Sequence, residues 1–141
     1  MIYADTSALV KRYLEEPFST EFEALLRQGP MTVSHLSIVE MRCALARRRR
    51  NREIDAVREN RANAELAADI HAGALRVGDI DNAHFTAACH LIDRLTDYPL
   101  RTLDALHLAV AEQLAVTDFA TADKTQADAA QALGFTVHRF Y

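Results

Sequence analysis

The chain has 141 residues, of which 50% are hydrophobic and 26% are charged. This composition excludes an intrinsically disordered chain, and the length fits one compact domain over residues 1–141. The apolar runs are short and broken by charge, so no transmembrane helix is expected. The first residues lack the basic start and long apolar core of a secretory signal. We therefore expect a cytoplasmic protein without membrane contact.

The net charge is −4, from 16 basic and 20 acidic residues, which disfavours a surface that binds nucleic acid throughout. The charge is unevenly distributed, because residues 42–61 contain eight arginines and only three acidic residues. Such a run is most often a solvated helical face with salt bridges. It could also hold a phosphate backbone if an acidic metal site lay beside it.

The two cysteines, Cys43 and Cys89, form neither a CxxC motif nor a disulfide framework, as expected in a reducing compartment. Each lies in an apolar stretch with helical periodicity. We therefore predict that both are small buried hydrophobic residues.

Short apolar segments alternate with longer helical patterns along the chain. In chain order, the first half contains a strand at 2–4, helices at 7–14 and 20–27, a strand at 31–34, and a helix from 37 through the arginine run. The second half contains helices at 54–75, 82–95 and 102–114, a strand at 119–121, a helix at 123–133 and a strand at 136–140. A turn is predicted at residues 78–81.

This alternation predicts an α/β fold with a short parallel sheet and helices on both of its faces. Ligands of such sheets bind beyond the carboxyl ends of the strands. Four acidic residues fall at strand ends or helix starts: Asp5, Glu40, Asp104 and Asp123. Asp104 lies in the first turn of a very apolar helix, where burial of an unpaired carboxylate is costly.

Each acid also has an ordinary structural explanation. Glu40 fits a capping box with Ser37, and Asp104 and Asp123 could cap their own helices. Taken singly, such caps are the commoner outcome, although Asp5 starts no clear long helix. Taken together, the four acids favour convergence, and a carboxylate cluster needs a cation to stay ionised. Oxygen ligands suit Mg²⁺ or Mn²⁺, as one or two ions, and their bound water can attack phosphorus.

Several segments resemble a known family in the order in which they occur. They are residues 2–11 (IYADTSALVK), 15–17 (EEP), 34–45 (SHLSIVEMRCAL), 103–109 (LDALHLA), 119–123 (FATAD) and 133–135 (LGF). The ordered set resembles PIN domains, and within them the VapC-type toxins of bacterial toxin–antitoxin pairs. The resemblance spans nearly the whole chain.

The resemblance implies a three-layer Rossmann-like PIN domain with a short central parallel sheet flanked by helices. It also implies a Mg²⁺- or Mn²⁺-dependent endoribonuclease that cuts RNA, a homodimer, and a small antitoxin protein whose tail enters the acidic groove. The catalytic and metal-binding acids of the family match, in order, Asp5, Glu40, Asp104 and Asp123. Ser7 and Thr121 match hydroxyl positions that orient these acids, and Thr6 could help through its amide.

Some assignments stay open at this point. Asp118 is a second candidate for the fourth acid, and we prefer Asp123 because it follows the strand. The candidate RNA contacts are Arg47, Arg48 and Lys124. His107 lies one helical turn after Asp104 and could assist a proton transfer, although a lone helical histidine is more often structural.

Three functions are compatible with these residues. The first is the metal-dependent endoribonuclease toxin. The alternative is a catalytically silent PIN-like module that binds RNA or protein. A receiver-like domain phosphorylated at Asp5 ranks last, because Asp5-Thr6-Ser7 supplies no second acid. The sequence leaves the identity of the RNA, the number of metal ions and the particular antitoxin open.

Overall fold

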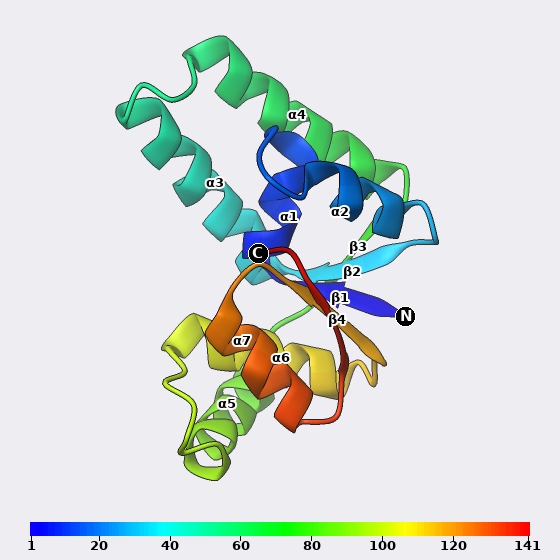
Figure 1. Cartoon of the computed structure of the whole chain (residues 1–141), viewed down its shortest axis with the longest axis vertical. Coiled ribbons are helices and arrows are strands. Elements are labelled where there is room, and N and C mark those ends of the chain that lie inside the picture. The colour runs from blue at the N-terminus through cyan, green and yellow to red at the C-terminus, as the bar shows by residue number, and fades with distance from the viewer.

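A computed structural model describes all 141 residues and has three layers, with helices above and below a central sheet (Figure 1). All strand pairings are parallel, and the strand order is β3-β2-β1-β4-β5. The strands are β1 (Ile2–Ala4), β2 (Met31–Ser34), β3 (Leu75–Gly78), β4 (Asp118–Thr121) and β5 (Thr136–Arg139). The predicted α/β fold with a short parallel sheet is therefore confirmed.

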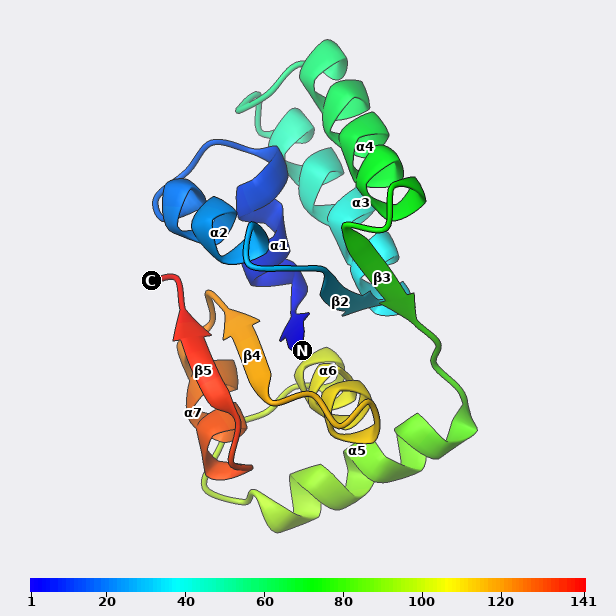
Figure 2. The same ribbon diagram turned by 90° about the vertical axis from the view of Figure 1, so that its right-hand side faces the viewer.

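Seven helices cover the two faces of the sheet (Figure 2). On one face lie α1 (Thr6–Tyr13), α2 (Ser19–Leu26), α3 (His35–Arg50) and α4 (Ala56–His71). On the other face lie α5 (Asn82–Arg94), α6 (Thr102–Gln113) and α7 (Lys124–Ala132). Helices α3 and α4 form a hairpin whose tip extends away from the sheet. None of the helices has the length and apolar character needed to span a membrane.

The residues of β1 divide between two cores, because successive side chains of a strand point to opposite faces. Ala4 packs with Leu9 and Met41 in the core under α1 to α4. Tyr3 packs with Phe119 in the core on the opposite face, together with most of α6. Helix α6 is buried continuously from Ala105 to Ala111, so it is an internal element that carries one polar residue, His107, into the interior.

The order of the strands identifies where a ligand should bind. The chain builds outward from β1 through β2 to β3, and then crosses to β4 and β5 on the other side of β1. The direction of winding therefore changes between β1 and β4. In open α/β sheets, this switch point opens a crevice at the carboxyl ends of the strands.

The strand β3 was not predicted, because we extended the preceding helix to residue 75. Helix α4 ends at His71, and Gly73 adopts a positive φ of 78°, which is the usual way for a helix to terminate. The strand that follows is an edge strand that pairs only with β2, and Leu75 is its one buried residue. Four residues with a single buried side chain give too weak a period to detect.

The prediction for the cysteines was wrong, since Cys43 and Cys89 are both exposed. The buried face of α3 is formed by Met41 and Leu45, and Cys43 lies between them on the outer face. An apolar stretch therefore does not by itself identify which face of a helix is covered.

Candidate active site

Asp5 directly follows β1, and its residue is only 5% exposed. Its Oδ1 accepts hydrogen bonds from the Ser7 hydroxyl at 2.6 Å and from the Ala8 amide at 3.1 Å. Its Oδ2 accepts from the Thr121 hydroxyl at 2.5 Å. Burial raises the pKa of Asp5, and these donors and His107 oppose the rise. Three donors thus fix the orientation of the Asp5 carboxyl group. A cation bound beside it would favour its charged form.

Glu40 lies in the second turn of α3 and lines the same cleft as Asp5. Its Oε1 accepts from the Thr6 hydroxyl at 2.9 Å and from His107 Nε2 at 2.6 Å. Burial opposes ionisation of Glu40, but the hydrogen bonds from His107 and Thr6 and the nearby Arg101 outweigh it, so the pKa of Glu40 is lowered. The capping box with Ser37 does not form, because α3 begins earlier, with Ser34 as its N-cap.

Asp104 and Asp123 each cap a helix with one carboxylate oxygen. Asp104 Oδ2 accepts from the Arg101 amide at 3.1 Å, at the start of α6. Asp123 Oδ1 accepts from the Gln126 amide at 2.8 Å, at the start of α7. The other oxygen of Asp104 has no hydrogen-bond partner in the protein, and that of Asp123 lies 3.9 Å from the Arg101 guanidinium. Capping and site formation are therefore compatible, because each function uses a different oxygen.

All four predicted acids line a single cleft of about 110 Å³, at the switch point between β1 and β4. No hydrophobic residue contributes to it, and its walls are formed by Asp5, Thr6, Ser7, Glu40, Arg101, Asp104, His107 and Asp123. The structure thus brings together the residues that the sequence analysis selected from four separate segments.

The hydroxyls of Ser7 and Thr121 connect the carboxyl ends of the two central strands, β1 and β4. Ser7 Oγ accepts from the Ala122 amide at 2.8 Å, and Thr121 Oγ1 accepts from the Asp123 amide at 3.0 Å. Because both hydroxyls donate to Asp5, they connect the start of α1 to the segment that carries Asp123. Thr6 contributes through its hydroxyl rather than through the amide that we expected.

Asp118 lies outside the cleft, at the amino-terminal end of β4. Its carboxylate bonds the Thr117 hydroxyl at 2.6 Å and His138 Nε2 at 2.7 Å. Of the two candidates for the fourth acid, only Asp123 lies with the other three.

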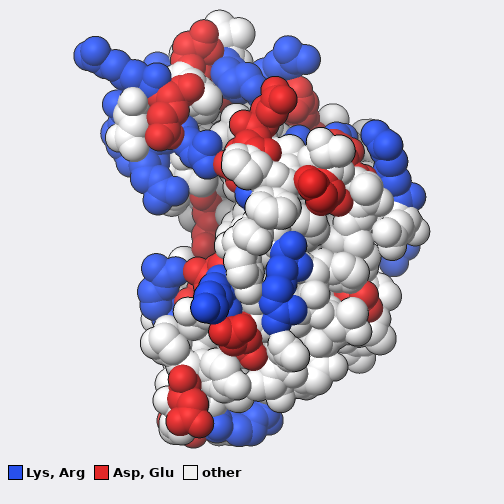
Figure 3. Space-filling view, viewed as in Figure 1, with Lys and Arg blue, Asp and Glu red and all other residues white.

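A larger groove of about 520 Å³ opens beside the acidic cleft and shares Thr6, Ser7, Glu40 and Arg101 with it. Arginines of α3 form one of its walls. Figure 3 shows a hollow on this side of the molecule, with basic atoms above it and acidic atoms at its back. The groove thus places a positive wall directly next to an acidic floor.

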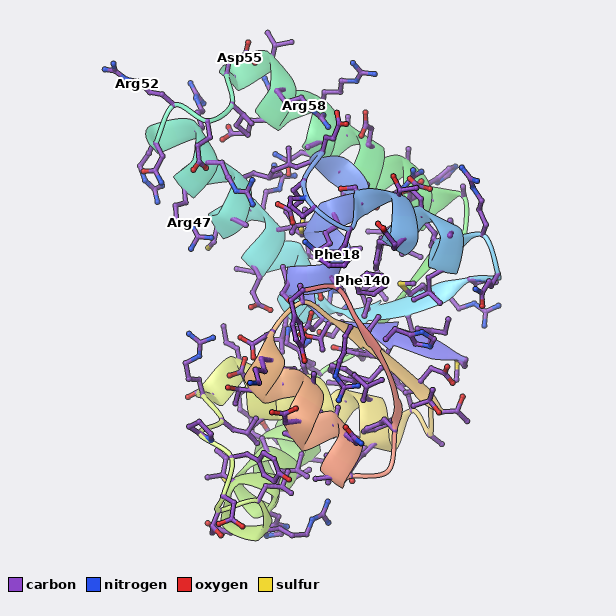
Figure 4. All side chains as sticks on the ribbon, viewed as in Figure 1. Phe18, Arg47, Arg52, Asp55, Arg58 and Phe140 are labelled. Atoms are coloured by element: carbon purple, nitrogen blue, oxygen red, sulfur yellow. The ribbon has the colours of Figure 1, made fainter.

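The three candidate RNA contacts are placed differently. Arg47 is exposed, lines the groove and projects from the outer side of α3 (Figure 4). Arg48 also lines the groove, but its guanidinium donates to Glu16 at 2.6 Å, so its charge is already paired. Lys124 is exposed and is not among the residues that line the groove or the cleft.

Arg101 and Gln126 are residues of the site that the sequence analysis missed. Arg101 carries the one guanidinium that lines the acidic cleft, and its Nε lies 3.3 Å from Asp104 Oδ2. Gln126 is fully buried, and its side-chain amide donates to the Asp104 carbonyl oxygen at 3.1 Å, which joins α7 to α6. Arg101 could have been found from the sequence, because it lies three residues before Asp104 at the start of a helix.

Replacing Arg101 with alanine is expected to tighten binding of Mn²⁺ or Mg²⁺, because the guanidinium competes with a cation for Asp104 and Asp123. The Arg101 side chain is 79% exposed, and such pairs contribute at most about 1 kcal/mol, so an increase of up to about fivefold is expected. Calorimetric titration with Mn²⁺ measures it. Arg94→Ala, which removes an exposed pair with Glu112, is the matched control. Unchanged or weaker binding by Arg101→Ala would contradict this role.

The residues of the cleft fit a divalent cation in their chemistry. No three acidic, histidine or cysteine side chains converge into a ready-made metal cage. The lining nevertheless offers carboxylate and hydroxyl oxygens, and Asp104 and Asp123 each keep an oxygen free of hydrogen bonds. Mg²⁺ keeps several waters and binds through one or two carboxylates, so this donor set suits it.

The fold and the cleft together define an α/β protein with an acidic centre at the switch point of a parallel sheet. A family model of the PIN domain matches residues 2–132. The chain is 35% identical over 138 residues to Ribonuclease VapC46 of Mycobacterium tuberculosis (strain ATCC 25618 / H37Rv), covering 96% of this chain and 95% of that protein. The chain therefore belongs to the PIN-domain family.

Solved structures share the fold at lower identity. VapC20 of M. tuberculosis, described as a toxin that cleaves the sarcin-ricin loop, has a TM-score of 0.74 and 19% identity, covering 96% of this chain and 97% of that one. DNA-bound VapBC from Salmonella typhimurium has a TM-score of 0.70 and 14% identity, covering 99% and 98%. The resemblance to VapC-type PIN domains is confirmed by these comparisons together with the curated relative.

Proposed function

We propose that the protein is a Mg²⁺- or Mn²⁺-dependent endoribonuclease that acts as the toxin of a type II toxin–antitoxin pair. One observation carries the proposal: four carboxylates from separate segments line one polar cleft, and the hydrogen bonds that hold them leave oxygens free to face it. The 35% identity to a VapC ribonuclease supports the nuclease assignment. We propose further that residues 1–141 form one domain.

The acids that would hold one or two metal ions are Asp5, Glu40, Asp104 and Asp123. When bound, such an ion activates water for attack on phosphorus and stabilises the leaving oxygen. Ser7 and Thr121 keep Asp5 in its place by donating to its two oxygens, and so favour its ionised form.

The groove beside the cleft is our candidate for the path of the RNA backbone. Arg47 and Arg50 line it without an acidic partner, so their charge is available to phosphates. Arg48 contributes less in this scheme, because Glu16 neutralises it. Lys124 would contact RNA only if the RNA backbone continued past Asp123.

The decisive experiment compares RNA cleavage by the wild type and Asp104→Asn in Mg²⁺, in Mn²⁺ and with chelator. Asparagine still caps α6, so the variant should fold while lacking one carboxylate charge. We expect cleavage only by the metal-loaded wild type, with a loss of at least about a hundredfold in the variant. Cleavage that persists in chelator would contradict metal dependence. A folded wild type that binds metal and RNA but cuts none of a structured-RNA panel would favour the catalytically silent binding module.

The proposed protein partners are a small antitoxin and a second copy of this chain. The DNA-bound VapBC structure from Salmonella typhimurium supports the antitoxin, because its fold is shared by nearly the whole chain. Light scattering of the purified protein, alone and with the product of the adjacent gene, tests both partners.

A further inference from the structure

A chain of hydrogen bonds runs from the core of the protein to the acidic cleft. Tyr3 Oη lies 2.6 Å from His107 Nδ1, and His107 Nε2 lies 2.6 Å from Glu40 Oε1. Tyr3 is completely buried and His107 is 3% exposed, whereas Glu40 lies at the rim of the cleft. The three residues belong to β1, α6 and α3, so the chain connects three elements of the fold.

The directions of these hydrogen bonds follow from the chemistry of the groups. An ionised carboxylate can only accept, so His107 Nε2 must carry a proton that it donates to Glu40. In the neutral imidazole, Nδ1 is then an acceptor, and the Tyr3 hydroxyl donates to it. The phenol of Tyr3 is protonated at neutral pH, so it can donate this hydrogen bond. The tyrosine thus selects the tautomer that presents a donor to Glu40.

We propose that His107 is a positioning residue, anchored by Tyr3, that holds Glu40 by Oε1 and so leaves Oε2 available to a divalent cation. The inference rests on the proposed function. Both imidazole nitrogens of His107 are engaged by protein partners, so in this scheme neither nitrogen is free for the proton transfer that the sequence analysis considered. Hydrogen-bonded partners behind metal ligands are a general means of fixing ligand orientation.

Packing alone does not explain a histidine at this position. Its neighbours along α6, Leu106 and Leu108, are buried hydrophobic residues, and the ring contacts Tyr3 edge-on at 5.8 Å between centroids. A leucine would fill comparable space in this core, but it would remove the nitrogen that accepts the Tyr3 hydroxyl proton and leave Glu40 with Thr6 as its only side-chain donor. With Thr6 as the single donor, the Glu40 carboxylate is less firmly fixed.

The test uses three variants: His107→Leu, His107→Gln and Tyr3→Phe. A glutamine amide nitrogen can reach the position of imidazole Nε2 and donate to Glu40, whereas leucine removes the donor. Calorimetric titration with Mn²⁺ at fixed pH gives the dissociation constant, and thermal unfolding verifies that each variant is folded. We expect about tenfold weaker binding for His107→Leu, recovery to near the wild-type value for His107→Gln, and a smaller weakening for Tyr3→Phe.

A Glu40→Gln background separates positioning from a general effect on the core. We expect His107→Leu to produce no further change in Mn²⁺ affinity once the carboxylate is removed. An equal loss in both backgrounds would overturn the proposal, as would wild-type affinity in His107→Leu. If His107→Leu does not fold, Tyr3→Phe and His107→Gln carry the same comparison. Failure of the wild type itself to bind Mn²⁺ would instead overturn the proposed function, and this inference with it.

Discussion

Replacing Asp5 with asparagine is expected to abolish RNA cleavage and, in the metal-free protein, to raise the melting temperature. Asp5 is the most buried acid of the cleft, and both of its oxygens are held by hydroxyl donors. Removing its charge withdraws the ligand around which the site is arranged, so we expect activity to fall by at least about a hundredfold. Asparagine can still accept the Ala8 amide, which keeps the N-cap of α1.

The gain in stability follows from the direction of the pKa shift. Burial raises the pKa of Asp5 in the folded protein above its unfolded value. A carboxyl group shifted in this direction favours the fold at low pH, and that contribution is lost as the pH rises through the folded-state pKa. Above the folded-state pKa, the metal-free wild type therefore bears the cost of a buried charge, which asparagine avoids.

Thermal unfolding in chelator at several pH values measures this effect. The wild type should lose stability relative to Asp5→Asn as the pH rises, and added Mn²⁺ should stabilise only the wild type. Asp5→Ala removes the cap as well as the charge and should lose about 1 kcal/mol relative to Asp5→Asn. Asp93→Asn, an exposed residue of α5, is the control for charge alone. A less stable Asp5→Asn in chelator would show that the charge is not destabilising.

The second large effect is expected at the groove, where Arg47→Ala combined with Arg50→Ala should weaken RNA binding strongly and in a salt-dependent way. Each phosphate contact on single-stranded RNA contributes about 0.7 to the slope of log affinity against log salt. Loss of two contacts should therefore reduce the slope by about 1.4. Measurement in the Asp104→Asn background avoids cleavage during the titration.

A matched pair of substitutions distinguishes local contact from general attraction. Arg52→Ala combined with Arg61→Ala removes the same charge from the hairpin tip and from α4, outside the residues that line the groove. Figure 4 shows Arg52 at the far end of the hairpin, beyond Arg47. We expect this control to change affinity little at moderate salt. If both double variants weaken RNA binding equally, the groove is not the path of the backbone.

The convergence of the four acids could be predicted because they lie at the ends of strands or the starts of helices, which can be recognised in the sequence. Asp5 and Asp123 follow strands, and Asp104 lies in the first turn of an apolar helix, so the end of each element identified them. The sequence analysis treated helix capping as a competing explanation for Asp104 and Asp123 and expected no clear long helix after Asp5. In the structure all three acids cap a helix and also line the acidic cleft. The assignment of metal ions to them remains a prediction.

What could not be predicted are the contacts that join distant segments. Tyr3 and His107 are 104 residues apart, and His107 and Glu40 are 67 apart, so no local pattern links them. Hydrophobic periodicity places Tyr3 and His107 in a core, but it does not show that their polar atoms meet. The pairing of Arg48 with Glu16, which removes it from the free charge of the groove, depends in the same way on tertiary packing.

The hydroxyl of Thr121 also has a consequence for the order of events during synthesis. Thr121 bonds Asp5 across 116 residues of sequence, and Ala122 bonds Ser7 across 115. Contacts between such distant residues form late in folding, after the loop between them has closed. A nascent chain that has not yet emerged beyond β4 therefore holds its first acid without these partners and lacks Asp123. The acidic cleft is therefore complete only once the segment from Asp118 to Asp123 has joined the first residues of the chain.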